Sequence, residues 1–461
     1  EEDSPEQHYT DTLTAACGLA DPNAVWGMTQ AASELVRSLH HLGVQFNVTD
    51  DDELDLRNFG GQKKKRTAFA QSDTGKQLMT ALIDAVRREE SAGTVERFPH
   101  HKFRTLLLSG NICGGCTVQD TYTGELLRFV CDAVLIATGG LHGLFGDTTG
   151  SLANTGEVTA ELFRLGVPMA NLEMIQYHPT TVELGEKRML LSEAARGEGG
   201  RLFALRNGKP WYFMEEKYPE LGNLMPRDIT AREVWTVSRD YEVFLDMTEL
   251  PKEVMEHKLA GLVDDCQTYL HKDIRKEPIP ILPGIHYFMG GIQVDERHRT
   301  SMRNLYAAGE CCAQYHGANR LGGNSLLGAI YGGQIAAETA CQEAAGSPNM
   351  PCAEEPLLPD LSPDAQMQMN RILLNALGVV RDAQTLEAGI QKIRKLSGTL
   401  PLLGCAMLES ALARKESRGA HWRADYPQRN DAVYCKTTVA HWNGQHIAIS
   451  FESIPERRHD L

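Results

Sequence analysis

The feature of this sequence that most constrains its fold is a pair of short apolar segments that each run into glycine. Residues 126–136 are largely apolar and end in Ala137-Thr138-Gly139-Gly140, and residues 304–308 end in Gly309-Glu310. Short apolar runs bounded by glycine are typical of buried strands. Because glycine has no side chain to block the backbone, a cofactor can approach both strand ends closely.

A long apolar helix is predicted shortly after the second of these strands. Asn324-Ser325 opens the helix fourteen positions after Glu310, and residues 326–340 continue it. Ser325 is well suited to cap this helix. Free backbone N–H groups and the positive end of the helix dipole suit such a helix start to an anionic or electron-rich edge of a ligand.

The other segments divide the chain into regions of different character. From Glu173 to about Pro283, charged residues and proline-bounded loops indicate an inserted lid domain. Residues 348–363 form a proline-rich, acidic linker. Periodicity predicts amphipathic helices and alternating strands elsewhere. The expected helices cover residues 9–42, 75–88, 364–396 and 401–418, and the further strands cover residues 105–108, 117–120 and 433–454.

The composition is that of a soluble multidomain protein. The chain has 461 residues, of which 42% are hydrophobic and 23% are charged. At about 150 residues per domain, this length predicts about three domains. No segment of about 18 consecutive apolar residues occurs, so no membrane-spanning helix is predicted. The formal charge of −15 argues against nucleic acid as a partner.

Lys63-Lys64-Lys65-Arg66 is the one basic run in this acidic sequence. Runs of like charge usually lie on solvated loops. The alternative is that this run forms a wall of a site for an anionic substrate. Both interpretations stay open at the level of the sequence.

The cysteines argue against a secreted, disulfide-bonded protein. The chain has 11 cysteines, an odd number, and Cys311 and Cys312 are adjacent. Cys113-Gly-Gly-Cys116 has the spacing of a redox or metal motif, but it lacks a second pair. We expect a hairpin turn at this point, with redox or metal chemistry as the alternative. No metal site is predicted.

Between residues 176 and 320 the chain collects side chains that suit a doubly charged ligand. Each is flanked by glycine, proline or small residues. Arginine matches a carboxylate as a planar fork of donors, so several arginines and histidines together can hold a dicarboxylate. These residues are His178, Ser192, Glu193, Arg196, Arg227, His286 and Arg320.

Motifs spread over nearly the whole chain resemble, in order, those of the succinate dehydrogenase, fumarate reductase and L-aspartate oxidase flavoprotein family. A segment of the predicted helical region, Arg414-Lys415-Glu416-Ser417-Arg418-Gly419-Ala420-His421, is similar to that family as well. The main motifs are Gln176-Tyr177-His178-Pro179-Thr180, Ser192-Glu193-Ala194-Ala195-Arg196-Gly197-Glu198-Gly199, Pro226-Arg227-Asp228, His286-Tyr287-Phe288-Met289-Gly290-Gly291 and His316-Gly317-Ala318-Asn319-Arg320-Leu321-Gly322-Gly323-Asn324-Ser325-Leu326.

The resemblance implies an α/β fold with a two-dinucleotide-binding-type FAD domain, an inserted α+β capping domain and a C-terminal helical domain. We expect the FAD-binding domain, incomplete at its start, to comprise residues 1–172 and 287–348. The capping domain would cover residues 173–286 and the helical domain residues 358–425. A small β segment, 426–461, would end the chain.

The resemblance also implies roles for single residues in fumarate and succinate interconversion. Phe59, His178, Ser192, His286 and Arg320 would bind the C4 dicarboxylate. Arg227 would carry the proton at substrate carbon, with Glu193 and Arg196 as its relay. FAD would be the cofactor, contacted by Thr138, Gly139, Glu310, Ser325 and Leu326.

Phe59 bears on the choice between branches of the family. In L-aspartate oxidase, a glutamate stands just before the Gly-Gly that here is Gly60-Gly61, and it balances the substrate ammonium. An aromatic ring cannot pair with an ammonium in that way, so Phe59 favours the fumarate and succinate enzymes. L-Aspartate oxidase stays the nearest alternative, and Phe59 as a loop residue that covers core is the plainer interpretation.

The sequence departs from the family pattern in two places. We expect a strand, a G-x-G-x-x-G turn and a helix for the cofactor diphosphate before the first residue, and these are missing from the sequence. Thr155-Gly156-Glu157-Val158 also differs from the family's Thr-Gly-Asp-Gly. A late start, a separate polypeptide that supplies the missing part, and a catalytically inactive binding or assembly partner are the three explanations.

The resemblance implies further partners and a location. No cysteine quartet for an iron–sulfur cluster is present, so an iron–sulfur electron-transfer subunit is one expected partner. The protein would be cytoplasmic, with attachment to the inner face of a membrane through partner subunits as an option. The residues do not decide the physiological direction of the reaction.

Overall fold

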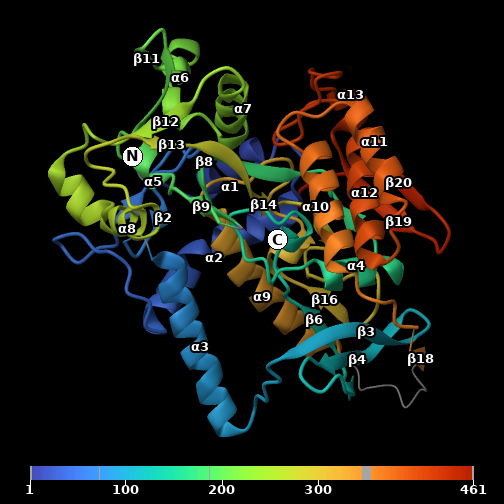
Figure 1. Cartoon of the computed structure of the whole chain (residues 1–461). Helices are drawn as coiled ribbons and strands as arrows, with labels where there is room; N and C mark the ends of the chain where they lie inside the picture. Colours follow the sequence, from blue (N-terminus) through green and yellow to red (C-terminus); the bar gives the residue numbers. More distant parts are fainter. Residues whose placement is uncertain (1–2, 72, 186, 345–352, 355, 459–461) are drawn as a thin grey trace.

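The computed structural model describes residues 3–71, 73–185, 187–344, 353–354 and 356–458. Helices and sheets are mixed along the chain, as the predicted α/β class requires (Figure 1). Among the described residues, no helix is long and apolar enough to cross a bilayer. No group of three or more His, Cys, Asp or Glu side chains in this part of the chain could hold a metal ion.

The two glycine-ended strands lie side by side. β6 (Val134–Ile136) and β16 (Leu305–Ala307) are parallel, and Leu305 pairs with Val134 while Ala307 pairs with Ile136. Parallel strands end at the same edge of a sheet, which is where cofactors bind in open α/β folds. The glycine-containing ends 137–140 and 308–310 are therefore neighbours.

The predicted apolar helix is α9 (Asn324–Glu343), but Ser325 does not cap it. The N-cap is Gly323, whose φ is +85°, and the helix start has no side-chain cap. A Cβ at Gly323 would lie 2.8 Å from Thr67 Oγ1. Both the backbone angle and the close neighbour favour glycine here, so the prediction that Ser325 caps the helix was wrong by two residues.

The hairpin turn expected at Cys113–Cys116 was also wrong. β3 (His101–Ser109) turns into β4 (Ile112–Asp120) before these cysteines, and Cys116 pairs with Leu106 inside the sheet. β4 in turn pairs with β5 (Leu126–Val130). A Cβ at Gly115 would lie 1.9 Å from the carbonyl oxygen of Phe129. The glycines thus permit close strand packing rather than a turn.

Two large and separate hydrophobic cores stand out among the clusters that the described residues form. One is built only from residues between Leu191 and Ile281, inside the predicted capping domain. It packs around a sheet of order β11-β10-β12-β13. The elements of this region are α5 (Ala194–Gly197), β10 (Arg201–Arg206), β11 (Lys209–Trp211), α6 (Phe213–Lys217), α7 (Arg227–Ser238), β12 (Val243–Asp246), α8 (Ala260–Asp265) and β13 (Ile279–Pro280).

The other core is shared by the FAD-binding region and the C-terminal helices. It joins residues such as Phe163 and Ile292 with Leu373 and Met407. The helices α10 (Pro363–Ala376), α11 (Ala383–Ile393) and α12 (Thr399–Ala413) lie beside the FAD-binding region, on its right in Figure 1. The helical region therefore has no core of its own.

The C-terminal helices differ from the two amphipathic helices that were predicted. The first splits because the Asp382 side chain accepts a hydrogen bond from the Thr385 backbone N–H at 2.8 Å and caps a new helix, α11. The second, α12, is buried almost all round. Its apolar residues therefore do not form the single stripe that was expected.

The tail forms strands as predicted, after a short helix α13 (Asp431–Tyr434). β19 (Lys436–Trp442) pairs with β20 (Ile447–Ser453) and with β7 (Met169–Ala170). The resulting sheet has the order β17-β15-β7-β19-β20, with β15 (Gly291–Gln293) and β17 (Cys312–Ala313). The tail thus extends a sheet of the FAD-binding region.

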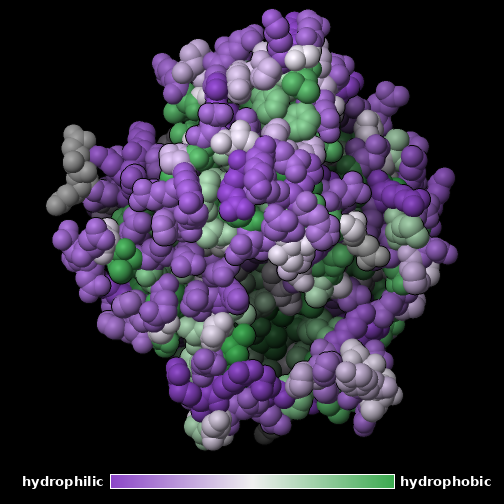
Figure 2. Space-filling view, turned by 60° about the vertical axis from the view of Figure 1, so that its left-hand side comes forward, coloured by the Kyte–Doolittle hydropathy of each residue, from purple (hydrophilic) through white to green (hydrophobic). Residues whose placement is uncertain are grey.

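Three helices precede these sheets. α1 (Pro5–Ala15) and α2 (Pro22–His41) start at proline with Ser4 and Asp21 as N-caps, and α3 (Thr74–Ala92) extends away from the body (Figure 1). All three lie where helical periodicity predicted helices. A view from the side that carries α3 shows a hollow with a hydrophobic floor and a hydrophilic rim (Figure 2).

Candidate active site

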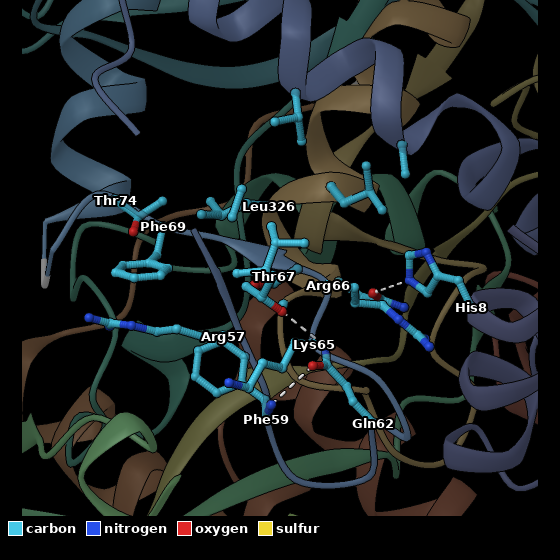
Figure 3. A pocket seen from close by; sticks show the side chains of 18 of the residues that line it. His8, Arg57, Phe59, Gln62, Lys65, Arg66, Thr67, Phe69, Thr74 and Leu326 are labelled. Carbon is cyan, nitrogen blue, oxygen red and sulfur yellow. Dashed lines mark hydrogen bonds between the residues drawn. The ribbon is translucent and has the colours of Figure 1, made fainter. Parts of the chain in front are cut away.

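A cavity of about 550 Å³ brings together most of the residues predicted to handle the substrate. The segment around Phe59, the α2 and α3 helices and the start of α9 also line it (Figure 3). Arg196 does not line the cavity but lies fully buried behind Glu193. The predicted residues on the wall are Phe59, His178, Ser192, Glu193, Arg227, His286, Arg320, Ser325 and Leu326.

Several elements supply these side chains. β8 (Ile175–Leu184) carries His178, and β14 (Leu282–Phe288), its antiparallel neighbour, carries His286. β9 (Lys187–Leu190) leads to Ser192 and Glu193. Arg227 is the first residue of α7. His178 and His286 stand 108 positions apart in the sequence and meet because their strands are neighbours in the sheet β14-β8-β9.

Arg227 is held by two partners inside the cavity wall. Its Nε donates to Glu193 Oε2 at 2.8 Å, and Nη2 donates to the same oxygen. Nη1 donates to Gln176 Oε1 at 3.2 Å. The guanidinium is thus fixed in a plane beside a buried carboxylate, a stronger arrangement than a single-point ion pair.

Glu193 lies between two guanidinium groups. Its Oε1 accepts from the Gly60 backbone N–H at 3.2 Å and lies 3.3 Å from Arg196 Nη2. Burial by itself raises the pKa of Glu193, but the charges of Arg227 and Arg196 outweigh it and hold the pKa below its ordinary value. Glu193 is therefore a carboxylate at neutral pH, in contact with both arginines.

The two histidines of the site are neutral. Burial, reinforced by nearby cations, holds the pKa of both His178 and His286 well below the usual value. Their rings meet edge to face with centroids 5.2 Å apart. His286 Nδ1 lies 2.9 Å from Thr149 Oγ1, whereas His178 Nε2 is buried and has no hydrogen-bond partner among the described residues. His178 is thus open to a ligand.

Arg320 is the least satisfied cation of the site. Its guanidinium makes no hydrogen bond to any residue that the structure describes, and its Nε is buried. The group lies over the ring of Tyr287, 4.4 Å from the centroid. Burial lowers the pKa of Arg320 to about 9, so the group remains charged at neutral pH. A buried cation without an acceptor calls for an anionic ligand.

These groups leave the catalytic end of the cavity with an excess of positive charge. Arg196, Arg227 and Arg320 are cationic, Glu193 is the one carboxylate among them, and the histidines are neutral. The excess equals the charge of a dicarboxylate dianion. Charge balance at this end therefore favours a ligand with two negative charges.

Phe59 lies on a tight loop that is tied to the catalytic end. Its backbone N–H donates to Gln62 Oε1 at 3.0 Å, and Gln62 Nε2 donates to Thr67 Oγ1 at 3.0 Å (Figure 3). A Cβ at Gly60 would lie 2.7 Å from Glu193 Oε1, so only glycine lets the loop approach that carboxylate. The loop that carries Phe59 therefore lies directly against the carboxylate that contacts Arg227.

Gln176 is a residue of the site that sequence reasoning did not select. It is fully buried, and its Oε1 accepts from Arg227. Its Nε2 donates to Asn319 Oδ1 at 2.8 Å and to the backbone oxygen of Arg320 at 2.9 Å. It stands two residues before His178 in a motif that was recognised, and side chains two apart on a strand share a face. That spacing could have identified it.

The sequence left two interpretations of the basic run 63–66 open, a solvated loop and a cavity wall, and each applies to part of the run. Lys65 and Arg66 line the cavity. The Arg66 side chain is only 7% exposed and forms ion pairs with Asp3 and Asp11. Lys63 is exposed. The run is thus partly a cavity wall and partly a solvated loop.

The predicted cofactor residues fall into two groups. Ser325 and Leu326 line the cavity in the first turn of α9, where backbone N–H groups have no partner within the helix (Figure 3). Thr138, Gly139 and Glu310 lie outside it, at the ends of β6 and β16. The Phe288 N–H donates to Glu310 Oε1 at 3.0 Å, and a Cβ at Gly140 would lie 2.6 Å from that oxygen.

These surroundings fit a flavin. The cavity has many apolar wall residues, the start of α9 offers N–H donors, and Gly139 and Gly140 leave their strand end free of bulky side chains. The Glu310 carboxylate has further acceptor positions, and these are suited to the hydroxyl groups of a ribose. The two groups of residues can thus serve the ring and the nucleotide end of one long cofactor.

Comparison with known proteins agrees with this arrangement. Residues 1–326 match the family described as FAD binding domain, and residues 397–458 match the family described as fumarate reductase flavoprotein C-term. FAD is therefore the cofactor, and the FAD-binding fold with a C-terminal helical part is the predicted one.

Individual relatives cover nearly the whole chain. The succinate dehydrogenase flavoprotein subunit of Bacillus subtilis is 37% identical, over 98% of this chain and 86% of its own length. An L-aspartate oxidase of Streptomyces coelicolor is 31% identical, over 99% and 85%. A solved quinol fumarate reductase chain of E. coli is 26% identical with a TM-score of 0.89, over 98% of this chain and 87% of that one.

Proposed function

We propose, from the premise that this chain belongs to the succinate dehydrogenase and fumarate reductase flavoprotein family, that it interconverts fumarate and succinate. The chain is a flavoprotein oxidoreductase. One observation carries the choice of substrate: the buried Arg227 is held by Glu193 in a cavity where the Arg320 guanidinium and His178 Nε2 lack hydrogen-bond partners among the described residues. Such a site is suited to a flat dianion.

Each residue of the cavity has a place in this reaction. Arg320, His178, His286 and Ser192 would hold the two carboxylates, with Phe59 covering the substrate. Fixed cations polarise the unsaturated diacid and orient it, so catalysis would depend mainly on position and electrostatics. When bound and reduced, FAD would supply the hydride for one carbon of the double bond.

Arg227 would supply the proton for the other carbon. A guanidinium holds its protons tightly, so a proton given to carbon has to be replaced at once. Glu193 contacts Arg227 at 2.8 Å and lies 3.3 Å from Arg196, and it can accept a proton from Arg196 and pass it on. In the reverse direction the same groups would remove a proton from succinate.

The cofactor contacts and the domain limits are part of the proposal. Ser325 and Leu326 would meet the flavin ring, and Thr138, Gly139 and Glu310 the nucleotide end. The separate core between Leu191 and Ile281 supports a capping domain at residues 173–286. An iron–sulfur subunit is the proposed electron partner, in line with the relatives that are called flavoprotein subunits.

The experiment that tests the proposal is fumarate reduction by FAD-loaded Arg227→Ala with a reduced viologen dye as donor. We expect turnover to fall by a factor of about 10³ or more, because the proton donor is lost. Dicarboxylate binding should change much less. Arg239→Ala, at the exposed end of the same helix, is the matched control. Near-normal turnover of Arg227→Ala would remove Arg227 from the mechanism.

A second measurement separates the branches of the family. L-Aspartate carries a net charge of −1 and an ammonium group, and Phe59 offers that ammonium no counter-charge. We therefore expect fumarate or succinate turnover to exceed L-aspartate oxidation by about 10² or more. Faster oxidation of L-aspartate than of succinate would assign the chain to the aspartate oxidase branch.

A further inference from the structure

The helix α1 contacts both walls of the cavity with one buried face. His8, Asp11 and Thr12 are its buried residues, and spacings of three and four place them on the same side of a helix. His8 also lines the cavity (Figure 3). None of these residues was selected from the sequence. Their partners lie in two different parts of the site.

One set of contacts runs from α1 to the first residue of α9. His8 Nε2 lies 2.9 Å from Asn324 Oδ1, and Asn324 Nδ2 donates to Thr12 Oγ1 at 2.9 Å. The Thr12 hydroxyl in turn donates to the His8 backbone oxygen at 2.8 Å. All three groups are buried. The first turn of α9 is thus held by a closed set of side chains from α1.

The chemistry of this set determines the form of the histidine. The Thr12 hydroxyl uses its proton on the His8 carbonyl, so it can only accept from the Asn324 amide nitrogen. The Asn324 oxygen then faces His8 Nε2, which must carry the proton. Burial lowers the pKa of His8, so the ring is neutral. His8 is therefore a neutral donor to Asn324.

The other set of contacts runs from α1 to the loop that carries Phe59. Asp11 Oδ2 lies 2.8 Å from Arg66 Nη2 and accepts from the Lys63 backbone N–H at 3.2 Å. Arg66 Nε also donates to Asp3, just before α1, at 2.9 Å. Asp11 is 3% exposed. The C-terminal side of the Phe59 loop is thus anchored to α1 by a buried ion pair.

We propose that His8 and Asp11 are positioning residues with separate targets. His8 sets the first turn of α9 against the flavin, and Asp11 sets the Phe59 loop over the dicarboxylate. The Asp11 half rests on the proposed function, whereas the His8 half rests on FAD as the cofactor and on the proposed contact of Ser325 and Leu326 with the flavin ring. Neither residue touches the reacting atoms.

Different consequences follow for the two residues. The N–H groups of the first turn of α9 favour negative charge beside them, and a flavin ring gains electron density on reduction. Loss of the His8 link should therefore weaken FAD binding and make the flavin harder to reduce. Loss of the Asp11 link should leave the flavin unchanged and loosen the cover over the substrate.

The His8 half is tested on FAD-loaded protein by flavin fluorescence and by redox titration of the flavin absorbance. For His8→Phe we expect an FAD affinity about tenfold lower and a potential about 30 mV more negative, the equivalent of tenfold for a two-electron couple. His8→Gln keeps an amide donor and should recover most of both losses. Thr14→Ala, on the exposed face of α1, is the control.

The Asp11 half is tested by steady-state kinetics with fumarate. For Asp11→Ala we expect KM to rise about tenfold while kcat stays within about twofold, with an unchanged flavin potential. Asp11→Asn keeps an oxygen acceptor for Arg66 and should recover part of the KM. If the unsubstituted protein does not turn over fumarate, the proposed function fails, while the His8 half is still decided by the flavin measurements.

Two results would overturn the proposal. A flavin potential and FAD affinity that His8→Phe leaves unchanged would remove His8 as a positioning residue. An Asp11→Ala substitution that shifts the flavin potential as well as raising KM would contradict separate targets for His8 and Asp11. An Asp11→Ala protein with both quantities unchanged would remove Asp11 as a positioning residue. If His8→Phe does not fold, His8→Gln and an Asn324→Ala protein measure the same contact from both sides.

Discussion

Arg414 and Arg320 are both buried arginines, but their guanidinium groups have opposite surroundings. All three nitrogens of Arg414 donate, with Glu173 Oε1 at 2.7 Å, Glu416 Oε1 at 3.0 Å and Thr438 Oγ1 at 2.6 Å among the acceptors. Arg320 makes no side-chain hydrogen bond within the described part of the chain and lies over Tyr287. The first cation has its acceptors inside the protein, and the second requires an anion from outside.

The surroundings of Arg414 form a joint between three regions. Glu173 belongs to the start of the capping region, Arg414 follows α12, and Thr438 lies on β19. Arg418 extends the joint, since its guanidinium contacts Glu416 and Asp431. The motif 414–421, which resembled the family, therefore holds the helical region, the tail and the core together.

Buried charges of this chain are therefore of two kinds: those paired with other groups of the chain and those left for a ligand. In the joint, buried cations face carboxylates of this chain, and the acceptor for every Arg414 donor is internal. At the catalytic end, cations exceed carboxylates, and His178 Nε2 and Arg320 Nε have no partner among the described residues. Unpaired buried donors are costly for folding, so their presence points to a bound anion.

The largest expected effect comes from breaking the relay at the catalytic end. Glu193→Gln keeps the shape of the side chain but cannot carry a proton to Arg227. We expect fumarate turnover to fall by a factor of about 10² to 10⁴. The measurement is kcat with a viologen donor at saturating fumarate. Glu198→Gln, a partly exposed glutamate on the same segment, should keep normal turnover.

Arg414→Met breaks the joint. Glu173 then loses its cation in a fully buried place, while Glu416 keeps only Arg418, and we expect the free energy of unfolding to fall by about 3–5 kcal/mol. Urea denaturation measures the change. The fraction that remains folded should bind dicarboxylate normally. A loss below about 1 kcal/mol would contradict a structural role for the joint.

Acid should destabilise the catalytic end through His316. Burial, with the charge of Arg320, lowers the pKa of His316 to about 3. The unfolded chain binds a proton near pH 6.5 and the folded chain does not, so stability falls as pH drops below about 6.5. Between pH 7 and pH 5, the contribution of His316 should lower the free energy of unfolding by about 2 kcal/mol.

Urea denaturation of His316→Phe at pH 7 and pH 5 measures that contribution. The drop in stability between the two pH values should be smaller than in the parent protein by the same amount, whatever the stability at pH 7. His446→Gln, on an exposed turn, is the control and should keep the full drop. An identical drop in His316→Phe and the parent would contradict the prediction.

The smallest effect has the opposite sign to that at the joint. Arg320→Met, the same substitution as in Arg414→Met, removes a buried cation that has no acceptor among the described residues. We expect a gain of about 1 kcal/mol in the free energy of unfolding, together with loss of dicarboxylate binding. Thermal unfolding and fumarate titration measure the two changes. A destabilisation as large as that of Arg414→Met would mean that the two clusters are built alike.

Much of the site could be predicted because its residues stand in short motifs. His178, Glu193, Arg227, His286 and Arg320 were selected from types and surroundings, and all of them meet at one end of the cavity. The strands before Thr138 and Glu310 were also predicted, since short apolar runs ending in glycine have few other interpretations. Local patterns sufficed for these motifs and strands, in which the informative residues lie within about ten positions of one another.

Other features could not be predicted, because they depend on neighbours far away in the sequence. The pair Gly114-Gly115 indicates a turn locally, yet Phe129 on β5 makes it a place of close strand packing. Ser325 has the residue type of a cap, yet the loop with Thr67 makes Gly323 the cap. His8 carries no local signal, since its partner Asn324 is 316 positions away.

The sequence by itself determined the family, the flavin cofactor and the charged residues that are proposed to handle the substrate, because these follow from residue identity within short motifs. Only the tertiary structure decided which buried charges are satisfied. Arg414 and Arg320 look alike in the sequence, and they differ because the distant Glu173 reaches Arg414, whereas no described residue accepts a hydrogen bond from the Arg320 side chain. Pairing depends on distances of a few ångströms in space, and those distances are set by packing across the whole chain.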